Sequence, residues 1–218
     1  MFDKVYALGF PIYRFYYNKD KIKQVYEELL KLEYNKNPNN MMWSGVKEDG
    51  TGINLHSLPQ FKEIFLWFHD CLKEVKKDMK LTCDELKIVS SWANLNKTNQ
   101  SFHSHQHPNC FMGSNYYASG ISNDKTVWYV ENPYFKNSNL QPMSSNDVDN
   151  GGLYLKHVED TEPGKYVVFP PSIMHYATEN TDQEPRITIA ANIYPNGNIS
   201  CGSAVSYTHL TLPTTPYV

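Results

Sequence analysis

The sequence predicts an α+β fold in which two amphipathic helices precede a run of short strands. Apolar residues recur at helical spacing within the first eighty residues, whereas from Leu86 onward short β-branched and aromatic segments alternate with turn residues. No internal repeat or linker divides the chain. We therefore expect one domain over residues 1–204, with a helical part at about 18–80 and a β core at about 86–200 that closes into a barrel or sandwich.

The N-terminal part begins with the aromatic and β-branched segment Lys4–Tyr17, which contains Gly9 and Pro11 and predicts an opening strand with a bulge or an edge position. Helices are expected over Asp20–Leu32 and over Pro59–Met79, because the apolar residues of each lie on one helical face. The predicted strands of the β core are Leu86–Asn94, Cys110–Ser119, Lys125–Val130, Lys165–Phe169 and Ile187–Tyr194. The polar segments Asn35–Gly52 and Asn137–Gly152 are expected to be loops at the mouth of a site.

The last fourteen residues, VSYTHLTLPTTPYV (Val205–Val218), resemble the translation of a transposon-end adapter used to prepare DNA for sequencing. We exclude residues 205–218 from the reasoning on fold and function, as for any fusion scar. The alternative is a genuine threonine-rich edge strand.

Composition limits the classes of function. The chain has 20 basic and 23 acidic residues, which argues against a nucleic-acid binder that relies on a basic surface. No apolar run approaches the roughly 20 residues of a membrane helix, and the first residues lack the features of a secretory signal. The four cysteines lack C-x-x-C spacing and are interpreted as free thiols, so we expect a cytoplasmic protein.

The stretch FHSHQHP places His103, His105 and His107 at alternating positions. On an extended strand these imidazoles would face one way, with neighbours about 6.6 Å apart. Such a pattern is poor for a core strand and suited to binding a metal ion, the alternative being a polar surface loop.

Two later residues complete a candidate site. His175 follows a predicted strand, and Arg186 opens the strand RITIAAN eleven residues later. A distant histidine can close one face of a metal site, and a nearby arginine can bind a carboxylate through two hydrogen bonds. The alternatives are a structural histidine at position 175 and a salt bridge from Arg186 to Glu184 or Asp182.

The segments HQHPNCFMGSNYY, YVVFPPSIMH and PRITIAANIY resemble three blocks of a family of Fe(II)/2-oxoglutarate-dependent oxygenases common in bacteria and their phages. SSWANLNK and FPIYRF also resemble the upstream pattern of that family, so the likeness covers nearly the whole chain up to Ala204. The resemblance implies a double-stranded β-helix core (jelly-roll, cupin-like) with flanking N-terminal helices. It also implies an oxidoreductase that uses Fe(II) as metal and 2-oxoglutarate as co-substrate, hydroxylates an unidentified substrate and releases succinate and CO2.

Carried over by position, the resemblance assigns His105, His107 and His175 to the metal, with His103 as an alternate ligand. It assigns Arg186 to the distal carboxylate of 2-oxoglutarate. We add Asn94, Tyr116 and Asn192 as candidate co-substrate contacts, since they fall on predicted core strands. For Tyr116, a place in the core or in the pocket wall is favoured over a reactive role.

Two features depart from the family pattern. Gly113-Ser114 stands where the family usually has Ser-Gly, and no Asp or Glu occurs from Leu86 to Asn123 to supply the usual carboxylate ligand. Two alternatives therefore stay open: a three-histidine dioxygenase that does not use 2-oxoglutarate, and a non-catalytic jelly-roll module that binds a metal or ligand.

Overall fold

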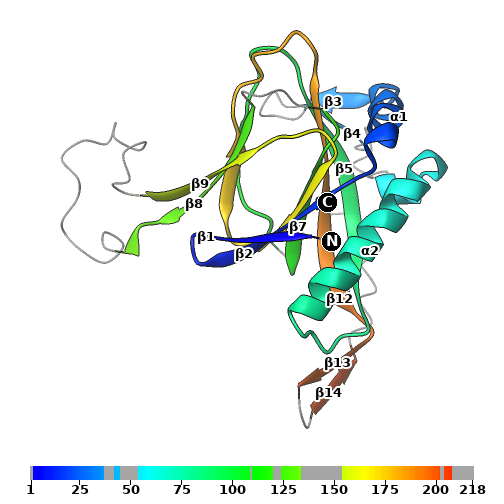
Figure 1. The fold of residues 1–218 in the computed structure, drawn as a ribbon, viewed down its shortest axis with the longest axis vertical. Coiled ribbons are helices and arrows are strands. Elements are labelled where there is room, and N and C mark those ends of the chain that lie inside the picture. Colours follow the sequence, from blue (N-terminus) through cyan, green and yellow to red (C-terminus); the bar gives the residue numbers. More distant parts are fainter. Residues whose placement is uncertain are drawn as a thin grey trace, which may run out of the picture.

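Two antiparallel β-sheets form the centre of the molecule (Figure 1). The computed structural model describes residues 2–36, 42–44, 54–108, 110–119, 124–133, 154–201 and 204–207. The larger sheet has the strand order β1-β2-β10-β7-β12-β5-β4-β3, and the smaller sheet has the order β6-β11-β8-β9. The strands of the larger sheet are β1 (Asp3–Ala7), β2 (Phe10–Tyr16), β3 (Tyr34–Lys36), β4 (Met42–Ser44), β5 (Glu85–Asn96), β7 (Met112–Tyr117), β10 (Lys165–Phe169) and β12 (Arg186–Asn196). Those of the smaller sheet are β6 (Phe102–His105), β8 (Lys125–Glu131), β9 (Tyr154–Asp160) and β11 (Met174–Ala177).

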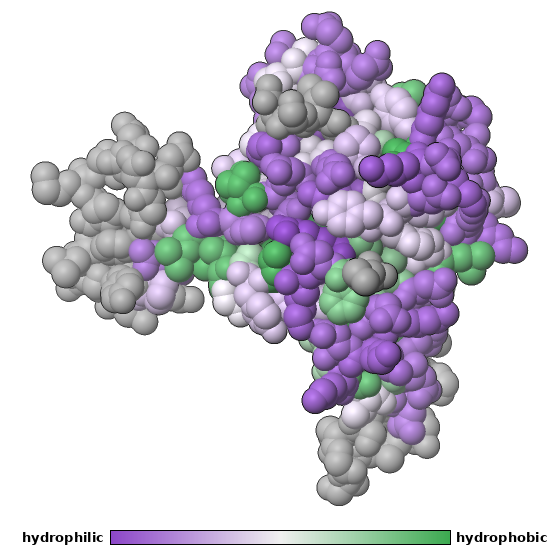
Figure 2. Space-filling model, viewed as in Figure 1, coloured by the Kyte–Doolittle hydropathy of each residue, from purple (hydrophilic) through white to green (hydrophobic). Residues whose placement is uncertain are grey.

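Two helices, α1 (Lys19–Leu30) and α2 (Lys62–Asp78), pack on the outer face of the larger sheet, and the short 3-10 turns Leu55–Ser57 and Pro59–Phe61 precede α2. The Phe68 ring of α2 stacks on Tyr166 of β10 with ring centroids 4.2 Å apart. The outward faces of both helices are hydrophilic (Figure 2), as the amphipathic pattern predicts. This arrangement confirms the predicted α+β class and leaves the inner face of the larger sheet free to face the smaller sheet.

The opening segment forms a hairpin, so the prediction of a single strand over Lys4–Tyr17 is wrong. Strand β1 pairs with β2 in a register that places Ala7 opposite Phe10, which leaves Leu8 and Gly9 as the two-residue turn. Both turn residues have positive φ, 56° at Leu8 and 85° at Gly9, as the tight turns that match the twist of a hairpin require. A glycine adopts this conformation without strain, so Gly9 reverses the chain instead of causing a bulge.

The later strands agree with their predicted positions, but β9 and β11 were not predicted. Strand β9 lies at the edge of the smaller sheet, and the one buried residue of its sequence YLKHVED is the charged Glu159. It therefore lacks the apolar alternation that marks a half-buried strand. Strand β11 has only four residues and contains His175. Strand β6 ends at His105, so His107 lies beyond the strand and not on it.

The predicted mouth loop 137–152 lies outside the described residues, as does most of the predicted loop 35–52. The described residues 35–36 and 42–44 belong to strands β3 and β4, so the loop prediction is wrong for them. At the C-terminal end, β13 (Asn198–Cys201) and β14 (Ala204–Tyr207) form a hairpin, and residues 208–218 are outside the described part. The interpretation of residues 205–218 as an adapter translation therefore stays a prediction, as does the domain limit at 204. Among the described residues, no helix combines the length and hydrophobicity that a membrane crossing requires.

Candidate metal centre

Three of the predicted ligands meet between the two sheets. His105 in β6 pairs directly across the sheet with His175 in β11, and His107 follows two residues after the end of β6. One ring nitrogen from each of these histidines lies within 4.8 Å of the other two. His103 is exposed and stacks on Phe102 with ring centroids 5.6 Å apart, so the structure does not bring it into the group.

Each of the three imidazoles is held by a hydrogen bond at Nδ1. His105 donates to the His103 carbonyl at 3.0 Å, and His175 donates to the Ile173 carbonyl at 3.1 Å. His107 donates to the Asn192 side-chain oxygen at 2.7 Å. Because these acceptors place the proton on Nδ1, the lone pair of each ring lies on Nε2. The Nε2 atom of His175 is buried and has no hydrogen-bond partner among the described residues, which is the state expected of a nitrogen that binds a metal.

The protonation of the three rings also suits a metal. Burial lowers the pKa of His105 to about 4 and lowers the pKa of His107. Burial and the two neighbouring imidazoles lower the pKa of His175 well below its usual value. A ligand imidazole must be neutral, and these pKa shifts keep all three rings neutral at pH 7.

The same shifts predict an acid-sensitive metal-free protein. The unfolded chain binds protons at its histidines below about pH 6.5, whereas the folded protein resists protonation at His105 until about pH 4. We therefore expect the unfolding free energy to fall as pH drops from about 6.5 towards 4, by up to about 1.4 kcal/mol per pH unit for each such histidine. Urea unfolding in the presence of a chelator at pH 7.5, 6.5 and 5.5 measures this slope. A constant unfolding free energy over this range would contradict it.

A cavity opens beside the histidines between the sheets. Its walls come from alternate residues of β5, β7 and β12 on one side and from the smaller sheet on the other. The residues of the larger sheet that line it are Trp92, Asn94, Asn96, Asn115, Tyr117, Arg186, Thr188 and Ala190. With the three histidines neutral, Arg186 is the charged side chain of the described lining.

Arg186 supplies the cationic group of the cavity. Its side chain is buried and its Nη1 lies 3.3 Å from Asp124, so the alternative of a surface salt bridge with Glu184 or Asp182 is wrong. Its Nη2 donates to the Thr178 carbonyl at 2.7 Å. Nε and Nη1 make no hydrogen bond in the described part of the chain. A buried guanidinium with N–H groups to spare is suited to a carboxylate ligand.

The three other predicted contacts of the co-substrate lie in different places relative to the cavity. Asn94 lines the cavity, where its side-chain oxygen accepts from the Trp92 indole N–H at 3.1 Å. Asn192 does not line the cavity and instead binds His107. Tyr116 is fully buried on the opposite face of β7, against Phe68 of α2, so the structure corrects its assignment.

Tyr117 occupies the position on β7 that had been expected for Tyr116. Its hydroxyl donates to Thr126 at 2.9 Å, and both residues line the cavity. Consecutive residues of a strand point to opposite faces, so only one of Tyr116 and Tyr117 can face the cavity. The sequence does not show which of the two it is. Asp124, the partner of Arg186, was also missed, because it precedes its strand and has no local motif.

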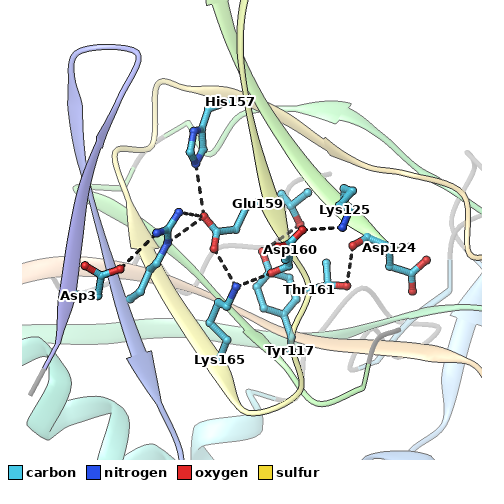
Figure 3. A network of polar contacts seen from close by, with 11 residues as sticks. Asp3, Tyr117, Asp124, Lys125, His157, Glu159, Asp160, Thr161 and Lys165 are labelled. Atoms are coloured by element: carbon cyan, nitrogen blue, oxygen red, sulfur yellow. Dashed lines mark hydrogen bonds and ion pairs between the residues drawn. The ribbon is translucent and has the colours of Figure 1, made fainter. Parts of the chain in front are cut away.

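A buried ion network lies behind the cavity wall (Figure 3). The Glu159 carboxylate of β9 accepts from Arg14 of β2 at 2.6 Å and from the Lys165 ammonium of β10 at 3.0 Å. Two residues after Glu159, Thr161 reaches the cavity and donates to the Asp124 carbonyl at 3.1 Å. The network therefore connects the two sheets at the end of the cavity that holds Arg186.

Comparison with known proteins shows what this arrangement is similar to. Residues 90–192, which include all three clustered histidines and Arg186, match the family model described as "Putative 2OG-Fe(II) oxygenase". This match, over 103 of the 218 residues, indicates a 2OG-Fe(II) oxygenase. It agrees with the Fe(II) and 2-oxoglutarate that the sequence resemblance implied. No curated protein matches the chain.

Solved structures of oxygenases share the fold at low sequence identity. A Burkholderia pseudomallei oxidoreductase of the 2OG-Fe(II) oxygenase family is 10% identical, with 83% of this chain and 80% of that chain covered and a TM-score of 0.55. A Pseudomonas putida prolyl-4-hydroxylase is 10% identical, with 85% and 93% covered and a TM-score of 0.56. HygX from Streptomyces hygroscopicus, solved with nickel, 2-oxoglutarate and hygromycin B, is 10% identical, with 84% and 82% covered and a TM-score of 0.55. These similarities confirm the jelly-roll fold of this oxygenase.

Proposed function

We propose that His105, His107 and His175 hold Fe(II) through Nε2 and that Arg186 binds the distal carboxylate of 2-oxoglutarate. The observation that carries this proposal is the convergence of three neutral imidazoles whose Nδ1 atoms are all occupied by acceptors. The reaction would be hydroxylation, in which one oxygen atom of O2 enters a substrate C–H bond and the other enters succinate as 2-oxoglutarate loses CO2.

The histidines, Arg186, Trp92 and Phe102 have separate roles in this scheme. Bound Fe(II) supplies the activation of O2 and 2-oxoglutarate. The cavity positions the co-substrate between the histidines and the Arg186 guanidinium, both of which line it. Trp92 and Phe102 contribute apolar walls that exclude water beside His107 and His105.

The substrate is proposed to be a small molecule, since HygX, which shares the fold, was solved with hygromycin B bound. We further propose that the protein works in the cytoplasm, where its three described cysteines, Cys71, Cys83 and Cys110, would stay as the free thiols that the structure shows.

A three-histidine dioxygenase is the second candidate, because the cluster of potential ligands contains no carboxylate among the described residues. The two candidates differ in their co-substrate. O2 consumption by the Fe(II)-loaded protein that requires 2-oxoglutarate and yields succinate supports the proposal. O2 consumption that depends on a thiol and ignores 2-oxoglutarate would support the second candidate.

Replacing Arg186 tests the co-substrate site. We expect Arg186→Lys to keep Fe(II) bound but to weaken 2-oxoglutarate binding about ten-fold or more, because lysine lacks the two-pronged donor geometry. The lysine also keeps a cation beside the buried Asp124, which protects the fold better than alanine would. Anaerobic titration of the Fe(II) protein with 2-oxoglutarate, followed by its visible charge-transfer band, measures the affinity. Unchanged 2-oxoglutarate affinity would remove Arg186 from the site.

A further inference from the structure

His107 differs from the other two histidines in how its ring is held. His105 and His175 each donate to a backbone carbonyl two residues earlier, at His103 and Ile173, which any sequence at those positions would provide. His107 donates to a side chain, Asn192, which lies 85 residues away on β12. Only this ring depends on the identity of a second residue for its Nδ1 acceptor.

We propose that Asn192 is a positioning residue that fixes the tautomer and the ring orientation of His107 for metal binding. The inference rests on the proposed role of His107 as a ligand. It reassigns Asn192, which the sequence had suggested as a contact of the co-substrate.

The packing around His107 cannot select the orientation of the ring by itself. Trp92 stacks on the ring with centroids 5.9 Å apart and planes 24° apart, and Phe169 contacts it edge-on at 5.8 Å. These contacts define a slot, but a rotation of the imidazole by 180° within it would exchange Nδ1 with a carbon atom and leave the outline of the ring almost unchanged. The hydrogen bond to Asn192 distinguishes the two orientations, because only one of them places Nδ1–H against the amide oxygen.

The backbone around Asn192 is adapted to this contact. The pairing of β12 with β5 shifts register between Asn192 and Ile193, and such bulges re-aim side chains next to sites. On the other side Asn192 pairs with Gly113 of β7. A Cβ atom at Gly113 would lie 2.8 Å from the Phe169 ring and 3.5 Å from Cγ of His107, so a side chain here would disturb the slot. This contact gives a physical reason for glycine at position 113.

The acceptor is also an amide and not a carboxylate, which affects the strength of the ligand. A carboxylate behind a histidine raises the basicity of the imidazole and strengthens its bond to a metal. With Asn192 in this place, all three acceptors behind the histidines are neutral, so aspartate at position 192 should bind metal at least as tightly as the native residue. Aspartate has only acceptor oxygens, so it also tests the direction of the hydrogen bond.

Co(II) titration of the metal-free protein, followed by the visible ligand-field spectrum, tests the proposal. We expect Asn192→Leu to weaken Co(II) binding by about 10–100-fold, as loss of a supporting partner typically does, and Asn192→Asp to bind at least as tightly as wild type. Asn196→Leu is the matched control, because Asn196 lies on the same strand and bonds Glu85 at the surface; it should leave the affinity unchanged. Thermal unfolding of each metal-free variant shows that the fold is retained.

The outcomes separate this proposal from the proposed function. If wild type binds Co(II) and Asn192→Leu binds equally well, Asn192 has no positioning role. If Asn192→Leu and Asn192→Asp weaken binding equally, the residue acts through packing or its amide N–H, and the proposal is overturned. If wild type shows no Co(II) spectrum, or if His175→Ala leaves that spectrum unchanged, the assignment of the metal site itself is wrong.

Discussion

Replacing His175 with alanine is expected to abolish metal binding. This ring has the most complete burial of the three, and its Nε2 has no hydrogen-bond partner among the described residues, so a metal ion gives that atom its partner. Removal of one of three protein ligands should cost more than the about 100-fold that loss of a supporting partner causes. Anaerobic Fe(II) titration, with and without 2-oxoglutarate, measures the loss through the visible band of the chelated complex.

His103→Ala is the matched control. His103 lies in the same histidine run, but its exposed side chain is outside the cluster, and alanine keeps the backbone carbonyl that accepts from His105. We expect this variant to bind Fe(II) like wild type. A loss of metal in His103→Ala, with metal retained in His107→Ala, would transfer the ligand role to His103. Normal Fe(II) binding by a folded His175→Ala variant would contradict the assignment of this metal site.

Replacing Glu159 with alanine is expected to lower the free energy of unfolding more than any other substitution considered for this protein. The carboxylate is 2% exposed and is shared by Arg14 and by Lys165, which is itself 5% exposed. Its removal takes away the anion that the two cations share, although Arg14 keeps Asp3 at 3.3 Å. Breaking a buried ion pair in this way typically costs about 3–5 kcal/mol. Urea unfolding at pH 7 measures this change.

Asp160→Asn provides the comparison for Glu159→Ala. Asp160 is the next residue and also forms an ion pair, with Lys125 at 2.6 Å, but its side chain is 72% exposed. Exposed pairs contribute about 1 kcal/mol or less, so this variant should unfold almost like wild type. Equal effects of the two substitutions would show that the Glu159 network contributes no more than a surface pair.

The sequence alone determined the class of fold and most of its elements, because those elements follow local patterns. The two helices and the strands β5, β7, β8, β10 and β12 all carry the apolar periodicity of their type. The edge strand β9 and the short strand β11 lack that signal, so only pairing with their neighbours reveals them. The β1–β2 hairpin was missed because a positive φ at Leu8 is unusual for a residue with a side chain.

The sequence also determined the family and the residue types of the site, since the histidines and Arg186 fall within recognisable motifs. Only the tertiary structure decided which of them meet. It excluded His103 from the cluster, assigned Asp124 to Arg186, replaced Tyr116 with Tyr117 and moved Asn192 from the co-substrate to His107. Each of these contacts joins segments whose relative position depends on strand register, and a shift of one residue reverses the face of every side chain.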